Sequence, residues 1–259
     1  MTSMTLAFTP IRMEISENKA GMIIHVNVSP KALPRPTTKD KLRQNITMMH
    51  FQQLVMKEAR GALRAKSLGI FNNDLSIEIE ITSIKSPQYF NLEDVLKAIF
   101  DGLNKHVIYD DSLISHAQIW LNKAPKRYPK TIIKVHIEDL VTRDSISFTL
   151  DLPSIEKRNP VVYNINASLN YDLQAAKDIA RTSRSFSLQN FTPVRQYEIC
   201  HMLFYTSDLS KDIDNMFFMY IDSIRDKGFL DYSNNIGIGM YKRHADKDNE
   251  RTIINLVSK

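Results

Sequence analysis

Apolar and polar residues alternate at several places along the chain, and this alternation predicts strands. Residues 75–84 alternate leucine or isoleucine with polar side chains, and residues 131–137 and 146–152 follow the same spacing. Successive side chains of a strand point to opposite faces of a sheet, so this spacing favours strands with one buried face. Shorter stretches of the same kind predict further strands at residues 22–28, 115–121, 195–205, 236–241 and 252–257.

Other segments repeat their apolar residues at helical spacing. Residues 45–65 and 92–103 place them three and four positions apart, and residues 169–180 and 213–225 do the same later in the chain. That spacing gathers apolar side chains on one side of a helix, which can then pack against a sheet. Strands and helices in this order predict an α+β fold with mixed sheets.

The chain also repeats itself at a fixed distance. Residues 131–133 spell Thr-Ile-Ile, as do residues 252–254, and subtracting 131 from 252 gives an offset of 121. The same offset aligns other identical residues, namely Asp101 with Asp222, Asp110 with Asp231, and Ser112 with Ser233. One offset that holds over this length predicts a tandem duplication. We therefore expect a first domain over residues 1–142 and a second over residues 143–259.

Acidic residues gather at equivalent places in the two halves. In the first half they occupy a predicted helix start and a later turn, with Glu93, Asp94, Lys97, Asp110, Asp111 and Ser112. In the second half the corresponding segments contain Asp212, Asp214, Asn215, Asp231 and Ser233. These segments resemble the signature of RusA-like Holliday junction resolvases, in which a helix start of the form D-x-D-N-L-x-K-A precedes D-D-S. The resemblance covers nearly the whole chain, as two copies.

The resemblance implies a fold and an activity. The fold would be two tandem RusA-like domains with mixed sheets and packed helices. RusA-like resolvases act as homodimers that nick opposite strands of a four-way junction, so the tandem would be an intramolecular pseudo-dimer able to act as a monomer. The implied function is a Mg²⁺-dependent endodeoxyribonuclease for Holliday junctions or other branched DNA, in the recombination or repair of a phage or prophage.

The chemistry of phosphodiester cleavage explains why such a site needs several carboxylates. Mg²⁺ prefers oxygen ligands, and a bound ion neutralises charge on the phosphate and activates water. We expect each half to build its own site, with the metal ligands Glu93, Asp110, Asp111, Asp212, Asp214 and Asp231. By resemblance, Lys97 assists near the phosphate, and Glu93, Lys97, Asp110, Asp111, Asp212 and Asp214 would carry catalysis.

Both halves depart from the family pattern. Asn91, Glu93 and Asp94 replace the first aspartate, the second aspartate and the asparagine in the first half. Phe218 replaces the lysine and Tyr232 the second aspartate of the pair in the second half. We expect the first half to carry most of the cleavage. The alternative is a degenerate module that binds DNA or a protein partner without cleaving, in which the aspartates only cap helices and turns.

The net charge of +5 suits a polyanionic partner. Basic residues in predicted loops are candidates for contacts with the DNA backbone, namely Arg35, Lys39, Arg43, Lys126, Arg127, Lys130, Lys242 and Arg243. A single cysteine, Cys200, and the lack of a long apolar run favour a cytoplasmic protein with no membrane partner. Because a small domain cannot cover its own apolar surface, we expect the halves to pack through their helical faces.

Overall fold

The computed structural model describes residues 21–26, 46–83, 92–124, 131–152, 186–189, 197–226 and 237–257. Its strands are β1 Gly21–Val26, β2 Leu75–Ser83, β3 Ile114–Lys123, β4 Thr131–Asp139, β5 Ser145–Leu152, β6 Phe186–Gln189, β7 Ile199–Thr206, β8 Gly237–His244 and β9 Arg251–Val257. Its helices are α1 Ile46–Ala65, α2 Leu92–Leu103 and α5 Ile213–Asp226, with short 3-10 turns at η3 Asp111–Leu113 and η5 Lys247–Asn249.

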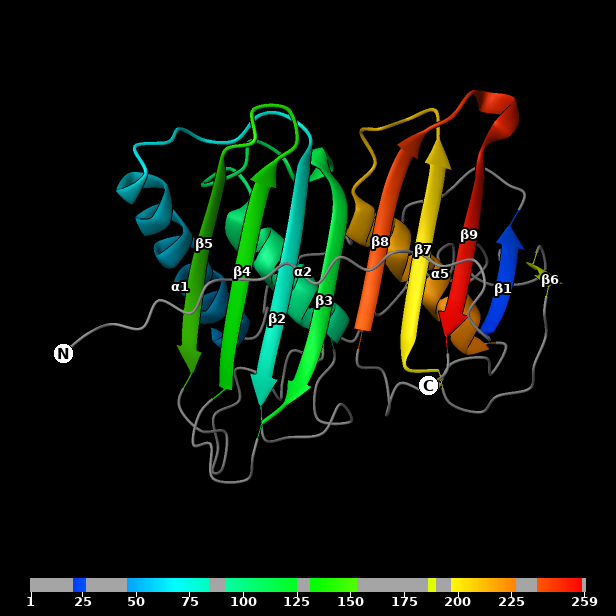
Figure 1. Ribbon diagram of the computed structural model, residues 1–259, viewed down its shortest axis with the longest axis horizontal. Helices are drawn as coiled ribbons and strands as arrows, with labels where there is room; N and C mark the ends of the chain where they lie inside the picture. The colour runs from blue at the N-terminus through cyan, green and yellow to red at the C-terminus, as the bar shows by residue number, and fades with distance from the viewer. Residues whose placement is uncertain are drawn as a thin grey trace.

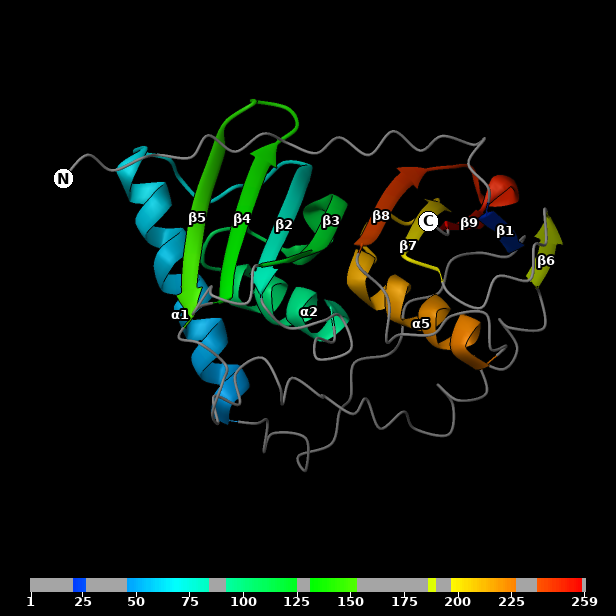
Figure 2. The same cartoon turned by 60° about the horizontal axis from the view of Figure 1, so that its bottom comes forward.

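Within these residues the strands form one mixed sheet of nine strands, in the order β5-β4-β2-β3-β8-β7-β9-β1-β6 (Figure 1). The three helices lie on the same face of that sheet (Figure 2). The architecture is therefore α+β with a mixed sheet, as the sequence predicts. None of the described helices is long and apolar enough to cross a membrane.

The alternation in the sequence becomes the alternation of burial in the sheet. Along β2, Leu75, Ile77, Ile79 and Ile81 are buried and the residues between them are partly exposed. β4 and β5 show the same period of two. Burying an aliphatic side chain stabilises a fold by roughly 1.5–3 kcal/mol, so one consistent face fixes which side of each strand meets the helices.

Helix α2 meets this buried face with the apolar side that its sequence predicts. Val95, Leu96, Ile99 and Phe100 are fully buried in the common core. At Gly102, α2 passes close to α1, because a Cβ there would sit 2.8 Å from the backbone oxygen of Gln52. Every predicted strand and three of the predicted helices are confirmed. The predicted helix at residues 169–180 lies outside the described residues.

The directions of neighbouring strands follow the same order on both sides of the middle of the sheet, where β3 pairs with β8. One side runs β3-β2-β4-β5 and the other runs β8-β7-β9-β1. On both sides the first pairing is parallel and the next two are antiparallel. Helix α2 begins at Leu92 and α5 at Ile213, which are 121 residues apart. The offset found in the sequence is thus also the distance along the chain between the starts of these two helices.

One strand towards each end of the sheet is exchanged between the two halves of the chain. Strand β1 comes from the first half but pairs with β9 of the second, and β5 comes from the second half but pairs with β4 of the first. The predicted boundary after residue 142 falls in the turn between β4 and β5. The division into two domains stays a prediction, and within the described residues the sheet is continuous across it.

The expectation that the halves pack through helical faces was incomplete. Helices α2 and α5 are in contact. The halves also join through antiparallel pairing of β3 with β8, from His116 opposite Tyr241 to Trp120 opposite Gly237. An unpaired strand edge presents N–H and C=O groups that need partners, and each half satisfies the edge of the other.

Candidate metal centre

Two acidic residues lie in the turn that leads from α2 into β3. Asp110 directly precedes η3, and its side chain accepts a hydrogen bond from the backbone N–H of Ser112 at 3.1 Å. Asp111 is the first residue of η3 and is buried, with 1% of its surface exposed. An aspartate is a favoured residue before such a turn because its short side chain reaches the free backbone N–H groups.

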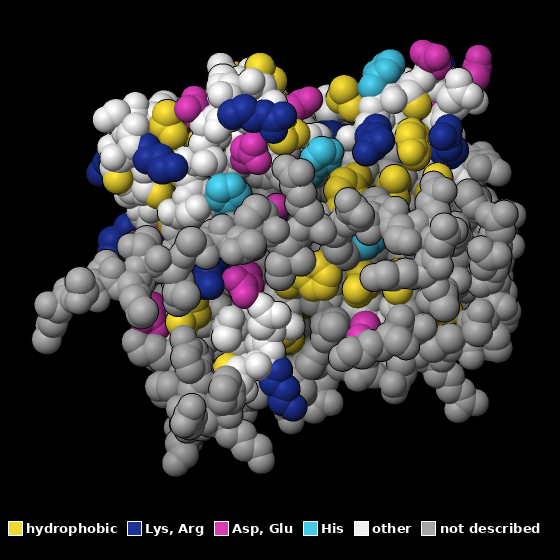
Figure 3. Space-filling view, in the orientation of Figure 1, with side chains coloured by type: hydrophobic (Ala, Val, Ile, Leu, Met, Phe, Trp, Pro, Cys, Tyr) yellow, Lys and Arg dark blue, Asp and Glu magenta, His cyan; other side chains and the backbone are white. Residues whose placement is uncertain are grey.

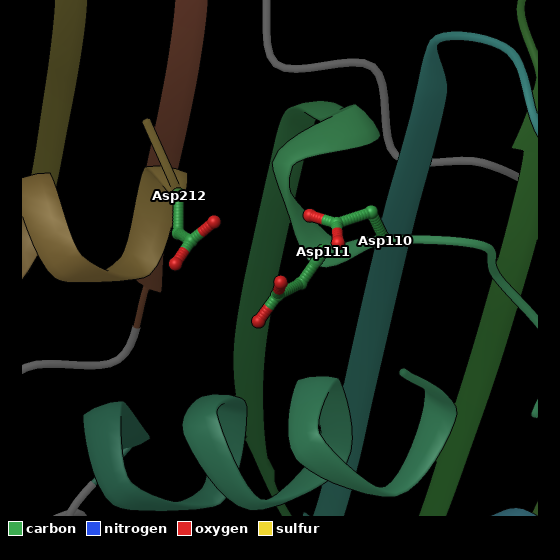
Figure 4. A group of neighbouring side chains, drawn as sticks. All are labelled: Asp110, Asp111 and Asp212. Atoms are coloured by element: carbon green, nitrogen blue, oxygen red, sulfur yellow. The ribbon is translucent and has the colours of Figure 1, made fainter. Parts of the chain in front are cut away.

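A third acidic residue approaches from the other half of the chain. Asp212 directly precedes α5, and ligand atoms of Asp110, Asp111 and Asp212 all lie within 4.8 Å of one another. Figure 4 shows Asp212 facing the two aspartates of the first half from the start of α5. The prediction of one site within each half was wrong for these residues. They instead form a composite centre to which both halves contribute.

The donor set fits a hard divalent cation. Mg²⁺ binds oxygen at about 2.0–2.1 Å, so two oxygens on opposite sides of one ion lie about 4.2 Å apart. That separation is close to the 4.8 Å limit within which the three ligand atoms lie. Carboxylate oxygens alone, without cysteine or histidine, favour Mg²⁺, Mn²⁺ or Ca²⁺ over Zn²⁺. The three residues could therefore hold a metal ion with a small closing movement.

A lysine compensates part of the negative charge. Lys105 Nζ donates a hydrogen bond to Asp110 Oδ2 at 2.5 Å and lies 5.0 Å from the centre of the Tyr109 ring. Hydrogen bonds from Lys105 and Ser112 lower the pKa of the Asp110 carboxyl to about 2. Asp110 is therefore an anion at any physiological pH, which is the form that binds metal.

Asp214, a predicted metal ligand, has a different partner. Its side chain is fully buried, and its Oδ2 accepts a hydrogen bond from Lys97 Nζ at 2.9 Å. Lys97 lies on α2 of the first half, so this ion pair also crosses between the halves. Burial alone would lower the pKa of Lys97, but the carboxylates of Asp214 and Asp101 outweigh it and raise that pKa above its ordinary value. Asp214 does not belong to the group of three aspartates. Because it follows Asp212 by two residues, its ion pair places Lys97 next to the start of α5.

Lys242, which the sequence analysis predicted as a DNA contact in a loop, lies inside the protein. It is 5% exposed, and its ammonium donates to the backbone oxygens of Ser112, Leu209 and Lys211 at 2.5, 2.8 and 3.0 Å. Those three bonds use its three hydrogens, which leaves none for a phosphate. Burial lowers the pKa of Lys242 to about 8. Lys242 thus links the residue after Asp111 to the residue before Asp212.

The other predicted site residues are placed only in part. Glu93 is in α2, although its side chain lies outside the described part, as does the whole of Asp231. The basic loop residues Arg35, Lys39, Arg43, Lys126, Arg127 and Lys130 also lie outside it. Arg243 is exposed, as a residue in contact with DNA must be. In the view of Figure 3, the Lys and Arg side chains of the described residues lie apart, among acidic, histidine and apolar ones.

Two contributions to the centre were missed by the sequence analysis. Lys105 belongs to no motif in the sequence. Its pairing with Asp110 depends on the turn after α2, where Lys105 has a positive φ of 63°. The burial of Lys242 could have been suspected, because it continues the alternation of a strand beside Tyr241, but its basic neighbour Arg243 suggested a surface loop. A local contact also involves Asp212, whose Oδ2 accepts a hydrogen bond from the side-chain amide of Asn215 at 2.8 Å.

Compared with known proteins, the chain matches no family model, no curated protein and no solved structure.

Proposed function

We propose that this protein is a Mg²⁺-dependent endodeoxyribonuclease that cleaves Holliday junctions or other branched DNA. The observation that carries the proposal is the composite centre, in which Asp110, Asp111 and Asp212 bring ligand oxygens within 4.8 Å of one another. Capping needs one aspartate at each turn and gives no reason for three carboxylates from two distant segments to converge. Like charges at this distance repel, so the arrangement favours a bound cation.

These three carboxylates would hold the ion. When bound, Mg²⁺ supplies charge neutralisation at the phosphate and a water with a lowered pKa. The chain itself contributes positive charge and fixed geometry. Lys97 stays protonated between Asp101 and Asp214, so it offsets part of their negative charge where a phosphate would approach. Lys242 holds the two acidic turns against each other through its carbonyl contacts, so the carboxylates are positioned before DNA binds.

The choice of branched DNA rests on the resemblance of the acidic segments to RusA-like resolvases, together with the net charge of +5. Under this proposal the fold is a tandem of two RusA-like domains joined as a pseudo-dimer. The matching order of strands on both sides of the β3 and β8 pairing supports that interpretation. The proposal also places the enzyme in the cytoplasm, where reducing conditions suit a chain whose one cysteine, Cys200, is buried.

Cleavage assays on purified protein test the proposal. A synthetic four-way junction and a linear duplex of the same sequence are incubated with Mg²⁺ or Mn²⁺, with an EDTA control. We expect cleavage of the junction that needs the metal and a preference over the duplex. Asp111→Asn and Asp212→Asn should each remove cleavage, because both residues belong to one centre. The double variant should then be no worse than either single variant.

Asp144→Asn is the matched control. Asp144 is exposed in the turn between β4 and β5, and it does not belong to the group of three aspartates that could hold the ion. This variant loses the same charge and should cleave at the unmodified rate. Failure of the unmodified protein to cleave any branched DNA with either metal would overturn the proposal. Binding without cleavage in the same assay would leave the degenerate DNA-binding module in its place.

A further inference from the structure

The pairing of β3 with β8 relates the two halves residue by residue. Gln118 lies opposite Gly239, and subtracting 118 from 239 gives 121, the offset of the repeat. Ala117 lies opposite Met240, and Ile119 opposite Ile238, so the neighbours on either side are also exchanged at that offset. A two-fold axis through the pair of Gln118 and Gly239 would produce this register. The composite centre should therefore have a counterpart on the other side of the axis.

The counterpart position has lost most of the chemistry of the centre. At an offset of 121, the positions that correspond to those of the centre hold other residue types: Tyr232 corresponds to Asp111, Asn91 to Asp212, Phe218 to Lys97 and Leu121 to Lys242. Asp110 becomes Asp231, and Asp214 becomes Glu93. Asn91, Asp231 and Tyr232 lie outside the described residues, so the comparison there concerns residue type alone. Phe218 and Leu121 are described, and both are buried, with 3% and 6% of their surfaces exposed.

These replacements remove the ligands and the positive charge together. An asparagine amide and a tyrosine hydroxyl are neutral, and neutral groups are weaker ligands for Mg²⁺ than carboxylates are. The ammonium groups of Lys97, which pairs with Asp214, and Lys242, which joins the two acidic turns, are replaced by a phenyl ring and an aliphatic side chain. Each half taken alone has a damaged site, but every residue of one composite centre is retained. The losses are thus concentrated on one side of the axis.

We infer that the chain carries one catalytic centre, not two, and that it cuts one DNA strand per binding event. This inference rests on the proposed nuclease function. A resolvase with two equivalent centres cuts two opposing strands of a bound junction in a coupled way. A chain with a single centre leaves a nicked junction, and a second cut needs a second binding event or a second molecule. Its substrate class is therefore branched DNA in which a cut in one strand is the product of the reaction.

A supercoiled plasmid that extrudes a cruciform separates the two outcomes. One cut relaxes the plasmid to an open circle, whereas coupled cuts on opposing strands release a linear molecule. With DNA in excess over protein, we expect the open circle to be the end product, because the first cut releases the supercoiling that keeps the cruciform extruded and so removes the branched substrate. Linear product that forms without a lag, at the rate at which plasmid is consumed, would overturn the inference. No cleavage of any kind would instead be the failure of the proposed function.

Binding of Mn²⁺, followed by electron paramagnetic resonance, gives a readout that does not depend on cleavage. Asp111→Asn and Asp212→Asn should each weaken Mn²⁺ binding by about 10–100-fold or more, since even partners outside the ligand set have effects of that size. Asp231→Asn, at the counterpart position, should leave both Mn²⁺ binding and nicking unchanged. Loss of either in Asp231→Asn would mean that a second centre works, and the inference would fail while the nuclease function stood.

Discussion

The ion pair between Lys97 and Asp214 gives the most direct test of how the two halves meet. Lys97 Nζ lies 2.9 Å from Asp214 Oδ2, and the Asp214 side chain is fully buried. Lys97→Met keeps most of the side-chain volume and removes the charge. The Asp214 carboxylate would then remain buried with its other oxygen accepting a bond from the backbone N–H of Asn215 at 2.8 Å.

The expected loss of stability in Lys97→Met comes from the buried Asp214 carboxylate, which loses its partner. Removing one partner of a buried ion pair costs about 3–5 kcal/mol, because the other charge stays desolvated. The Lys97 side chain is 26% exposed, so water can reach part of the space that the ammonium leaves. That access lowers the expected cost to about 2–4 kcal/mol. Asp101→Asn, which removes a partly exposed carboxylate 3.3 Å from Lys97 on the same helix, should cost only about 0.5 kcal/mol.

A double-mutant cycle isolates the pair. Lys97→Met, Asp214→Asn and the combined variant are unfolded with denaturant at pH 7 in EDTA, so that no metal contributes to the free energy of unfolding. We expect the combined variant to be more stable than the sum of the single effects predicts, by about 1–3 kcal/mol. Single effects that add to within about 0.5 kcal/mol would refute the ion pair between Lys97 and Asp214 as a contact that joins the halves.

Other consequences can be checked on the same protein. Burial lowers the pKa of His201 to about 4, so the unfolded chain gains a proton near pH 6.5 and the folded chain does not. Stability should be full above pH 6.5 and fall towards pH 4 by roughly 3 kcal/mol, and His201→Gln should flatten this dependence in denaturant titrations. Gly102→Ala should destabilise the fold by about 1–3 kcal/mol despite the better helix propensity of alanine, because its Cβ would collide with the Gln52 carbonyl oxygen. Thermal unfolding measures that loss, and a gain would contradict the close approach of the helices. Lys242→Leu should reduce cleavage and leave junction affinity unchanged, whereas Arg243→Ser should weaken binding and lower its salt dependence by about one unit of slope; the reverse pattern in a binding and cleavage assay would restore Lys242 as a DNA contact.

Local patterns determined the elements of this protein. The alternation at residues 75–84 became β2 at Leu75–Ser83, and the helical spacing at residues 92–103 became α2 at Leu92–Leu103. Both are set by neighbours within a few residues, through the periods of strand and helix. The offset of 121 is also a property of the sequence alone, and it reappears where Gln118 lies opposite Gly239.

Only the tertiary structure decided which of the acidic residues meet. The sequence places Asp110 and Asp111 in one half and Asp212 and Asp214 in the other, and nothing local indicates that Asp212 joins the first pair while Asp214 turns to Lys97. That choice depends on the pairing of β3 with β8, which brings together residues more than a hundred positions apart. The same pairing buries Lys242, because its surroundings come from Ser112 in one half and Leu209 and Lys211 in the other. Periodicity reports which face of an element is apolar, but the partner of that element is fixed by the free energy of the whole packed sheet.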